Sequence, residues 1–137
     1  MAAYLDTSVV LRVVLGQPES MDLSRHRPAF TSILTRVECL RSLDRTRILA
    51  GLSSEDLALR REAVFTALAG VEIVDLDDAI LERASLPAPV PIRTLDSLHL
   101  ATSLQWRDLH GGKVVFATHD RGLGTAARAY GLKVVGI

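Results

Sequence analysis

The sequence predicts an α/β fold in three layers, in which helices cover both faces of a central, mostly parallel sheet of four to five short strands. Two observations predict it. Short runs rich in Val, Ile and Phe alternate along the chain with longer segments in which apolar residues recur at helical spacing. The loops between them are short, which is typical of a parallel sheet flanked by helices. An all-helical bundle would leave the Val- and Ile-rich runs unexplained.

The first two strand and helix pairs occupy the N-terminal third of the chain. Ala3–Leu5 is a short apolar run that ends in Asp6-Thr7-Ser8, and a helix follows in which Val9, Val10, Val13 and Val14 recur at helical spacing. Pro28–Thr31 is the second expected strand, and a helix follows it from about Ser32 to Arg47. Its apolar face should carry Ile33, Leu34, Val37, Leu40 and Leu43.

The middle of the chain predicts two further helices around a third strand. Ser53 begins a capping pattern for a helix that Gly70 stops. Val71–Leu76 is the strand, and Asp77 can cap the second helix through about residue 85. The alternating prolines of Leu86–Pro91 remove backbone donors and hold the chain extended, so this segment is expected to be a loop.

The C-terminal third repeats the strand and helix pattern. Thr94 is expected to cap a helix over Leu95–Leu109, which a pair of glycines ends. Lys113–Ala117 is the fourth strand, Asp120–Tyr130 the last helix and Lys133–Ile137 the last strand. No internal repeat or long linker interrupts this order, so residues 1–137 are expected to form one domain.

Composition restricts the classes of function. Sixteen basic residues balance sixteen acidic ones, so binding to a nucleic acid would depend on local patches rather than on overall charge. The single Cys39 excludes an intramolecular disulfide and a zinc site with several cysteines. No basic leader and no apolar run of membrane-spanning length are present, so we expect a cytoplasmic protein that does not bind membranes.

Four acidic residues are expected at one edge of the sheet. Asp6 ends the first strand, Asp120 follows the fourth, and Asp96 lies in the first turn of a helix that starts at the same edge. Glu38 lies on the helix after the second strand, beside its buried face. Taken singly, Asp96 and Asp120 could each cap a helix, Asp6 could be a turn residue and Glu38 could be a solvated residue in mid-helix. Together they match the rule that ligands bind outside the carboxyl ends of parallel strands.

Clustered carboxylates repel one another until a proton or a cation relieves the repulsion. Mg²⁺ prefers oxygen ligands and commonly binds through one or two carboxylates together with substrate phosphate oxygens. Such an ion polarises a phosphoryl group and lowers the pKa of an attacking water. The four acids therefore predict a metal site that hydrolyses phosphodiester bonds.

Four segments occur in an order that resembles the PIN-domain nucleases. They are Leu5–Ser8, Thr35–Glu38, Arg93–Ala101 and Phe116–Asp120. The size of the chain and its order of strands and helices look most like the VapC toxin branch, the ribonuclease half of a toxin–antitoxin pair. The resemblance covers nearly the whole chain and implies a PIN-like fold with an Mg²⁺-dependent endoribonuclease activity, in which Mn²⁺ could replace Mg²⁺.

The resemblance also implies roles for single residues and for partners. The metal-site acids fall on Asp6, Glu38, Asp96 and Asp120, with Asp120 left open as a direct or an indirect ligand. Supporting polar positions fall on Thr7 and Thr118. The implied partners are RNA, a cognate antitoxin whose tail covers the active site, and a second copy of the chain in a homodimer.

Other residues near these segments allow further interpretations. Almost all basic residues are arginines, and Arg36 and Arg93 are the first candidates for RNA contacts because they neighbour the acids. His99 and His119 are read as structural, since a metal-activated water needs no imidazole. Cys39 has no evident activating base and is expected to be buried.

The sequence argues against two of three alternative functions and leaves the third open. A phosphoaspartyl phosphatase needs a second acid two residues after Asp6, where Ser8 stands. No Gly-rich phosphate loop follows a strand, which argues against an ATP or dinucleotide enzyme. The remaining alternative is a catalytically inactive PIN-like module that binds RNA or protein.

Overall fold

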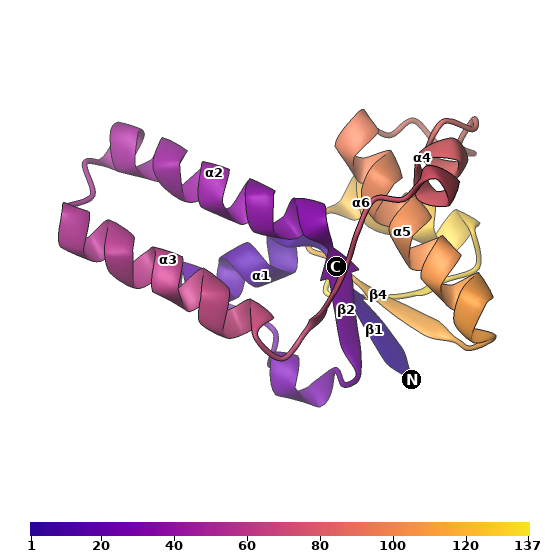
Figure 1. The fold of residues 1–137 in the computed structure, drawn as a ribbon, viewed down its shortest axis with the longest axis horizontal. Helices are drawn as coiled ribbons and strands as arrows, with labels where there is room; N and C mark the ends of the chain where they lie inside the picture. Colours follow the sequence, from indigo (N-terminus) through magenta and orange to yellow (C-terminus); the bar gives the residue numbers. More distant parts are fainter.

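The computed structural model describes residues 1–137 and contains a five-stranded sheet (Figure 1). β1 (Ala2–Leu5) lies at the centre between β2 (Ala29–Ser32) and β4 (Val114–Ala117), with β3 (Glu72–Val74) and β5 (Lys133–Val135) outside them. Every neighbouring pair is parallel. The carboxyl ends of the strands therefore meet at one edge, as the predicted fold requires.

Three helices cover one face of the sheet. They are α1 (Thr7–Val14), α2 (Ile33–Ala50) and α3 (Ser54–Leu68), which pack against one another. α2 and α3 form a long hairpin that reaches well beyond the sheet (Figure 1). A short 3-10 helix, η1 (Leu23–Arg25), precedes β2. A cluster of buried aliphatic side chains joins these helices to the sheet and includes Leu5, Val9, Val10, Val64 and Val115.

The other face carries α5 (Thr94–His110) and α6 (Arg121–Ala129), with α4 (Asp78–Ala84) packed against α5. Its core is aromatic where it meets the central strands and includes Tyr4, Phe30, Phe116, Leu100 and Leu123. Helices on both faces confirm the predicted three-layer α/β/α architecture. None of the helices has the length and apolarity that a bilayer crossing requires.

Most predicted helix starts are confirmed by their caps, but one is wrong. The side chains of Ser53, Asp77 and Asp120 each accept a hydrogen bond from a backbone amide in the first turn of their helix. Thr94 is instead the first helical residue of α5, and the extended N-cap is Arg93, whose side chain makes no capping bond. The helix starts one residue earlier than a capping threonine would place it.

The buried face of α2 also differs from the prediction. The residues buried along this helix are Thr35, Cys39 and Leu43, whereas Val37 is 50% exposed. They lie four residues apart, so they share one side of the helix. Because two of the three are small or polar, apolar periodicity alone did not identify this side. Cys39 is buried as expected.

The two edge strands are shorter than predicted. β3 and β5 each contain three residues and pair on one side only. The sequence suggested Val71–Leu76 and Lys133–Ile137, because apolar residues continue on both sides of the paired segment. Pairing, which a single strand's sequence does not reveal, sets these ends.

Candidate active site

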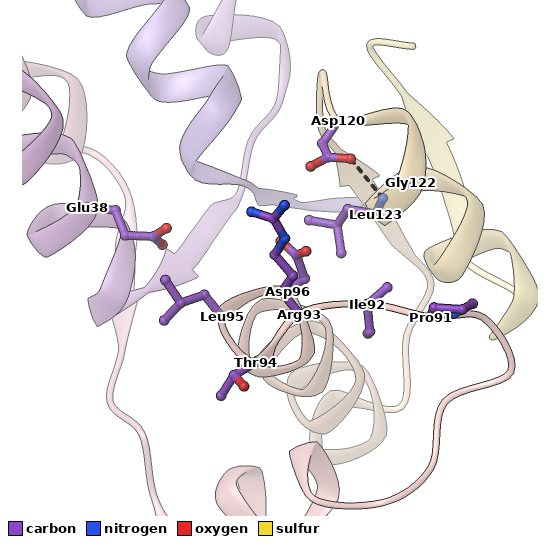
Figure 2. A pocket seen from close by; sticks show the side chains of 10 residues that line it. All are labelled: Glu38, Pro91, Ile92, Arg93, Thr94, Leu95, Asp96, Asp120, Gly122 and Leu123. Atoms are coloured by element: carbon purple, nitrogen blue, oxygen red, sulfur yellow. Dashed lines mark hydrogen bonds between the residues drawn. The ribbon is translucent and has the colours of Figure 1, made fainter.

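The fold brings the four predicted acids to the carboxyl edge of the sheet. Asp6 directly follows β1 and Asp120 is the N-cap of α6. Asp96 lies in the first turn of α5, and Glu38 lies near the start of α2. Glu38, Asp96 and Asp120 line one open pocket of about 910 Å³ (Figure 2).

Asp6 is buried and is joined to the residues of the pocket by hydrogen bonds. Its Oδ2 accepts bonds from Ser8 Oγ at 2.7 Å and from Thr118 Oγ1 at 2.8 Å. Thr118 Oγ1 in turn accepts the backbone amide of Asp120 at 3.0 Å. The carboxylate does not cap α1, although Asp6 is the N-cap residue. Both hydroxyls therefore hold one oxygen, and Oδ1 stays free of hydrogen bonds, 3.9 Å from His99 Nε2.

Glu38 is held directly by residues of α1 and α5, and indirectly by a residue of β1. Its Oε1 accepts a hydrogen bond from Thr7 Oγ1 at 3.0 Å and another from His99 Nε2. The other ring nitrogen of His99 shares a hydrogen bond with the hydroxyl of Tyr4. His99 is 1% exposed and Tyr4 is completely buried, so no solvent competes for these bonds. Oε2 of Glu38 is left without a partner.

This network couples the protonation of Glu38 and His99. Burial alone would raise the pKa of Glu38, but the hydrogen bond and charge of His99, with the bond from Thr7, lower it overall. Burial alone would lower the pKa of His99, but the bond to Glu38 and the negative charges of Asp6, Glu38 and Asp96 raise it overall. Each partner therefore favours the charged form of the other.

Asp96 and Asp120 lie in a more open setting. Burial raises the pKa of Asp96, and the neighbouring charges of Asp120 and Asp6 raise it further. A hydrogen bond from the backbone amide of Arg93 opposes this rise. Asp120 is exposed, and its Oδ1 accepts the amide of Leu123 at 3.0 Å, which leaves Oδ2 free. Figure 2 shows Glu38 reaching in from α2 on one side and Asp120 from the start of α6 on the other.

The donor set suits a hard divalent cation such as Mg²⁺, because carboxylate oxygens are its preferred protein ligands. Burial is the main cause of the raised pKa of Asp96, and the repulsion from Asp120 and Asp6 that adds to it is the kind that a cation relieves. The side chains do not form a closed cage as they stand, since no three His, Cys, Asp or Glu residues converge closely enough to hold an ion. Small side-chain movements at the pocket would have to complete the coordination.

The two candidate arginines differ in position. Arg93 lines the pocket beside Asp96 (Figure 2), whereas Arg36 is exposed on α2 and is not among the lining residues. The apolar part of the lining consists of Ile92, Leu95 and Leu123. Arg93 is thus placed to meet an anion bound at the acids, and Arg36 is not.

Cys39 has no place in this chemistry. Burial, together with the charges of Glu38 and Asp6, raises the pKa of its thiol to about 12. The thiol therefore stays protonated at neutral pH and is a poor nucleophile.

The fold and the pocket define an α/β protein with a carboxylate cluster outside the ends of its central parallel strands. A model of the family described as "PIN domain" matches residues 3–129. The chain therefore belongs to the PIN-domain family, which confirms the resemblance seen in the sequence.

Individual relatives agree with this assignment. Ribonuclease VapC46 of Mycobacterium tuberculosis (strain ATCC 25618 / H37Rv) is 32% identical over 98% of this chain and 96% of its own length. Among solved structures, a toxin–antitoxin complex from Klebsiella pneumoniae has a TM-score of 0.63 at 19% identity, covering 98% of this chain and 96% of that one. FitAcB from Neisseria gonorrhoeae has a TM-score of 0.66 at 18% identity, covering 96% and 95%. These two structures show the shared fold.

Three residues of the site had no assigned chemistry in the sequence. In the sequence alone, Ser8 is only part of a motif, Tyr4 belongs to an apolar strand, and His99 is expected to be structural. A signal for Tyr4 did exist: a tyrosine in a central strand is buried, and its hydroxyl then needs a polar partner. His99, one turn after Asp96 on α5, was the polar residue available to meet it.

Proposed function

We propose that this protein is an Mg²⁺-dependent endoribonuclease that acts as the toxin of a toxin–antitoxin pair. The observation that carries the proposal is that four carboxylates, three from the starts of α1, α5 and α6 and one from the side of α2, lie at one edge of the sheet. In Asp6, Glu38 and Asp120, one carboxylate oxygen accepts hydrogen bonds from the protein and the other accepts none. The second oxygen of each is therefore available as a metal ligand.

The free oxygens of Asp6, Glu38 and Asp96 would hold the cation, and Asp120 would complete its surroundings directly or through water. Bound there, Mg²⁺ would polarise the scissile phosphate and lower the pKa of the attacking water. Thr7 and Thr118 would keep Glu38 and Asp6 in orientation through the bonds described above. Arg93 would pair with a phosphate oxygen of the substrate at the pocket wall.

An RNA substrate is supported by the relatives and by the shape of the site. Relatives that match along most of this chain carry the name ribonuclease. The pocket is open and combines acids, Arg93 and a few apolar side chains. A chain of nucleotides can cross such a pocket, with its phosphate at the metal and its bases against the apolar lining.

An antitoxin partner is supported by the solved structures of similar fold. These include a toxin–antitoxin complex from Klebsiella pneumoniae and VapBC2 of Rickettsia felis. We extend this to a cognate antitoxin that covers the active site of this chain, and to a homodimer as the free form. Sedimentation of the purified chain would give its oligomeric state, and a monomer would contradict the second extension.

The activity is tested by incubating the purified protein with end-labelled total RNA in Mg²⁺, in Mn²⁺ and in EDTA. We expect discrete cleavage products with either metal and none with EDTA. Metal-independent binding without cleavage would contradict the proposal and would favour a catalytically inactive PIN-like RNA-binding module.

A further inference from the structure

We propose that His99, held in place by Tyr4, is a positioning residue that orients Glu38 for metal binding. This inference rests on the proposed function and adds to it the means by which one ligand is fixed. Glu38 projects from the side of α2, and its side chain is longer than those of the three aspartates, so its carboxylate has more freedom unless partners hold it. A glutamate has three rotatable side-chain bonds, so fixing its carboxylate requires partners.

The partners of His99 indicate this role. Glu38 Oε1 is an acceptor, so Nε2 of His99 carries the proton and donates it to that bond. The other ring nitrogen, Nδ1, is bonded to the hydroxyl of Tyr4, which can donate to a neutral imidazole or accept from a charged one. Because Tyr4 occupies Nδ1 in either state, the ring is held with the N–H of Nε2 directed at Glu38. A histidine that only filled the core would not need partners on both ring nitrogens.

Tyr4 is itself held rigidly. Its ring stacks on Phe116 at a centroid distance of 5.1 Å and meets Phe30 edge-on at 5.4 Å. Its position on central strand β1 is set by the pairing of Tyr4 with Phe30 and Phe116 across the neighbouring strands. The chain of contacts therefore runs from the rigid middle of the sheet, through Tyr4 and His99, to the carboxylate at the pocket.

Thr7 completes the arrangement on the same oxygen. Its hydroxyl also donates to Glu38 Oε1, so two donors from α1 and α5 converge there. Because Thr7 and His99 fix Oε1, they also fix the direction in which Oε2 points. Partners of this kind, which orient a ligand without touching the metal, commonly change metal affinity or activity by about 10- to 100-fold when they are removed.

The test compares two amide replacements in the full-length protein. In His99→Gln the amide nitrogen can take the place of Nε2 and still donate to Glu38. In His99→Asn it takes the place of Nδ1, which faces Tyr4, and Glu38 loses its donor. We expect the Mg²⁺ dissociation constant, measured by calorimetry, to rise about tenfold or more in His99→Asn and clearly less in His99→Gln. The cleavage rate should rank the variants in the same order.

Tyr4→Phe keeps the ring and removes only the hydroxyl, so it can test the positioning role if the histidine variants fail to fold. It should also raise the Mg²⁺ dissociation constant, with the circular dichroism spectrum unchanged. Equal Mg²⁺ affinities in His99→Gln and His99→Asn, or a wild-type affinity in Tyr4→Phe, would overturn the positioning role while wild-type cleavage stands. A wild-type protein that neither binds Mg²⁺ nor cleaves RNA would instead overturn the proposed function and this role with it.

Discussion

The two halves of the candidate site differ in how firmly they are held. In the half formed by Asp6 and Glu38, here called the braced half, each carboxylate accepts two side-chain hydrogen bonds. In the half formed by Asp96, Asp120 and Arg93, here called the open half, the side chains line the pocket and make few bonds. The first half is arranged before substrate arrives, and the second can still adjust.

This difference suggests a division of labour. A braced carboxylate loses little conformational freedom when it binds a metal, so its free oxygen is a prepared ligand. In the open half, burial raises the pKa of Asp96 and the negative charges of Asp120 and Asp6 raise it further, and a bound cation would relieve that repulsion. We therefore expect the braced half to set the position of the ion and the open half to respond to its charge.

The largest predicted effect is the loss of cleavage when either half loses a carboxylate. Asp6→Asn and Asp96→Asn should each lower the cleavage rate by more than about 100-fold, beyond what the loss of an orienting partner causes. Asp78→Asn, on exposed α4, is the matched control and should cleave like the wild type. Gel assays with labelled RNA measure the rates. Full activity in Asp6→Asn would mean that the carboxylate of Asp6, in the braced half, is not needed for cleavage.

A smaller effect should separate the two arginines. Arg93→Ala removes a cation from the pocket and should raise KM about tenfold, the value of one charge-assisted hydrogen bond to phosphate. Arg36→Ala is the control, because Arg36 lies outside the pocket lining and should leave KM unchanged. Steady-state cleavage of an RNA fragment gives both values. An equal rise in KM in both variants would mean that the position of Arg93 in the pocket gives it no special role in RNA binding.

Stability should respond to the same substitution in opposite ways in the two halves. Asp96→Asn removes a repelled charge and should raise the melting temperature of the metal-free protein by a few degrees. Asp6→Asn weakens the bonds from Ser8 and Thr118 and should lower it. Differential scanning calorimetry in EDTA compares them. A shift of the same sign in both variants would contradict the division into halves.

The smallest predicted effect is a pH dependence confined to the braced half. The raised pKa of His99 gives stability that is complete below about 6.5 and is lost as the pH rises through its folded value. The lowered pKa of Glu38 gives stability that is complete above about 4.5 and is lost as the pH falls through its folded value. The pair therefore contributes most between these two pH values.

Glu38→Gln tests this window. In EDTA it should lower the melting temperature more at about pH 5.5 than at about pH 8.5. Glu62→Gln, on an exposed part of α3, is the control and should show no such window. An equal loss at both pH values would mean that the ion pair with His99 does not stabilise the fold.

The sequence predicted the layers of the fold and the location of the acids well, because both follow from local patterns. Alternating strands and helices imply a parallel sheet, and acids that follow strand ends then lie at one edge. The buried face of α2 could not be predicted in the same way. Thr35 and Cys39 are buried because Thr35 bonds Thr31 and Thr7 and Cys39 packs in the core, and neither contact leaves an apolar repeat.

The bracing network was also beyond sequence patterns. Tyr4 and His99 are 95 residues apart, and their contact depends on how α5 packs over the sheet at β2 and β4. The position of Glu38 relative to Thr7 likewise depends on the packing of α1 against α2. Local rules can identify a residue as polar and buried, but the identity of its partner is decided by tertiary packing.

The most direct test of the shared metal site is a crystal structure of the protein soaked in Mn²⁺, with the ion located by its anomalous scattering. The account predicts a peak at the carboxyl edge of the sheet, bound by oxygens of Asp6, Glu38 and Asp96. A peak elsewhere, or one that contacts only a single acid of the four, would contradict it.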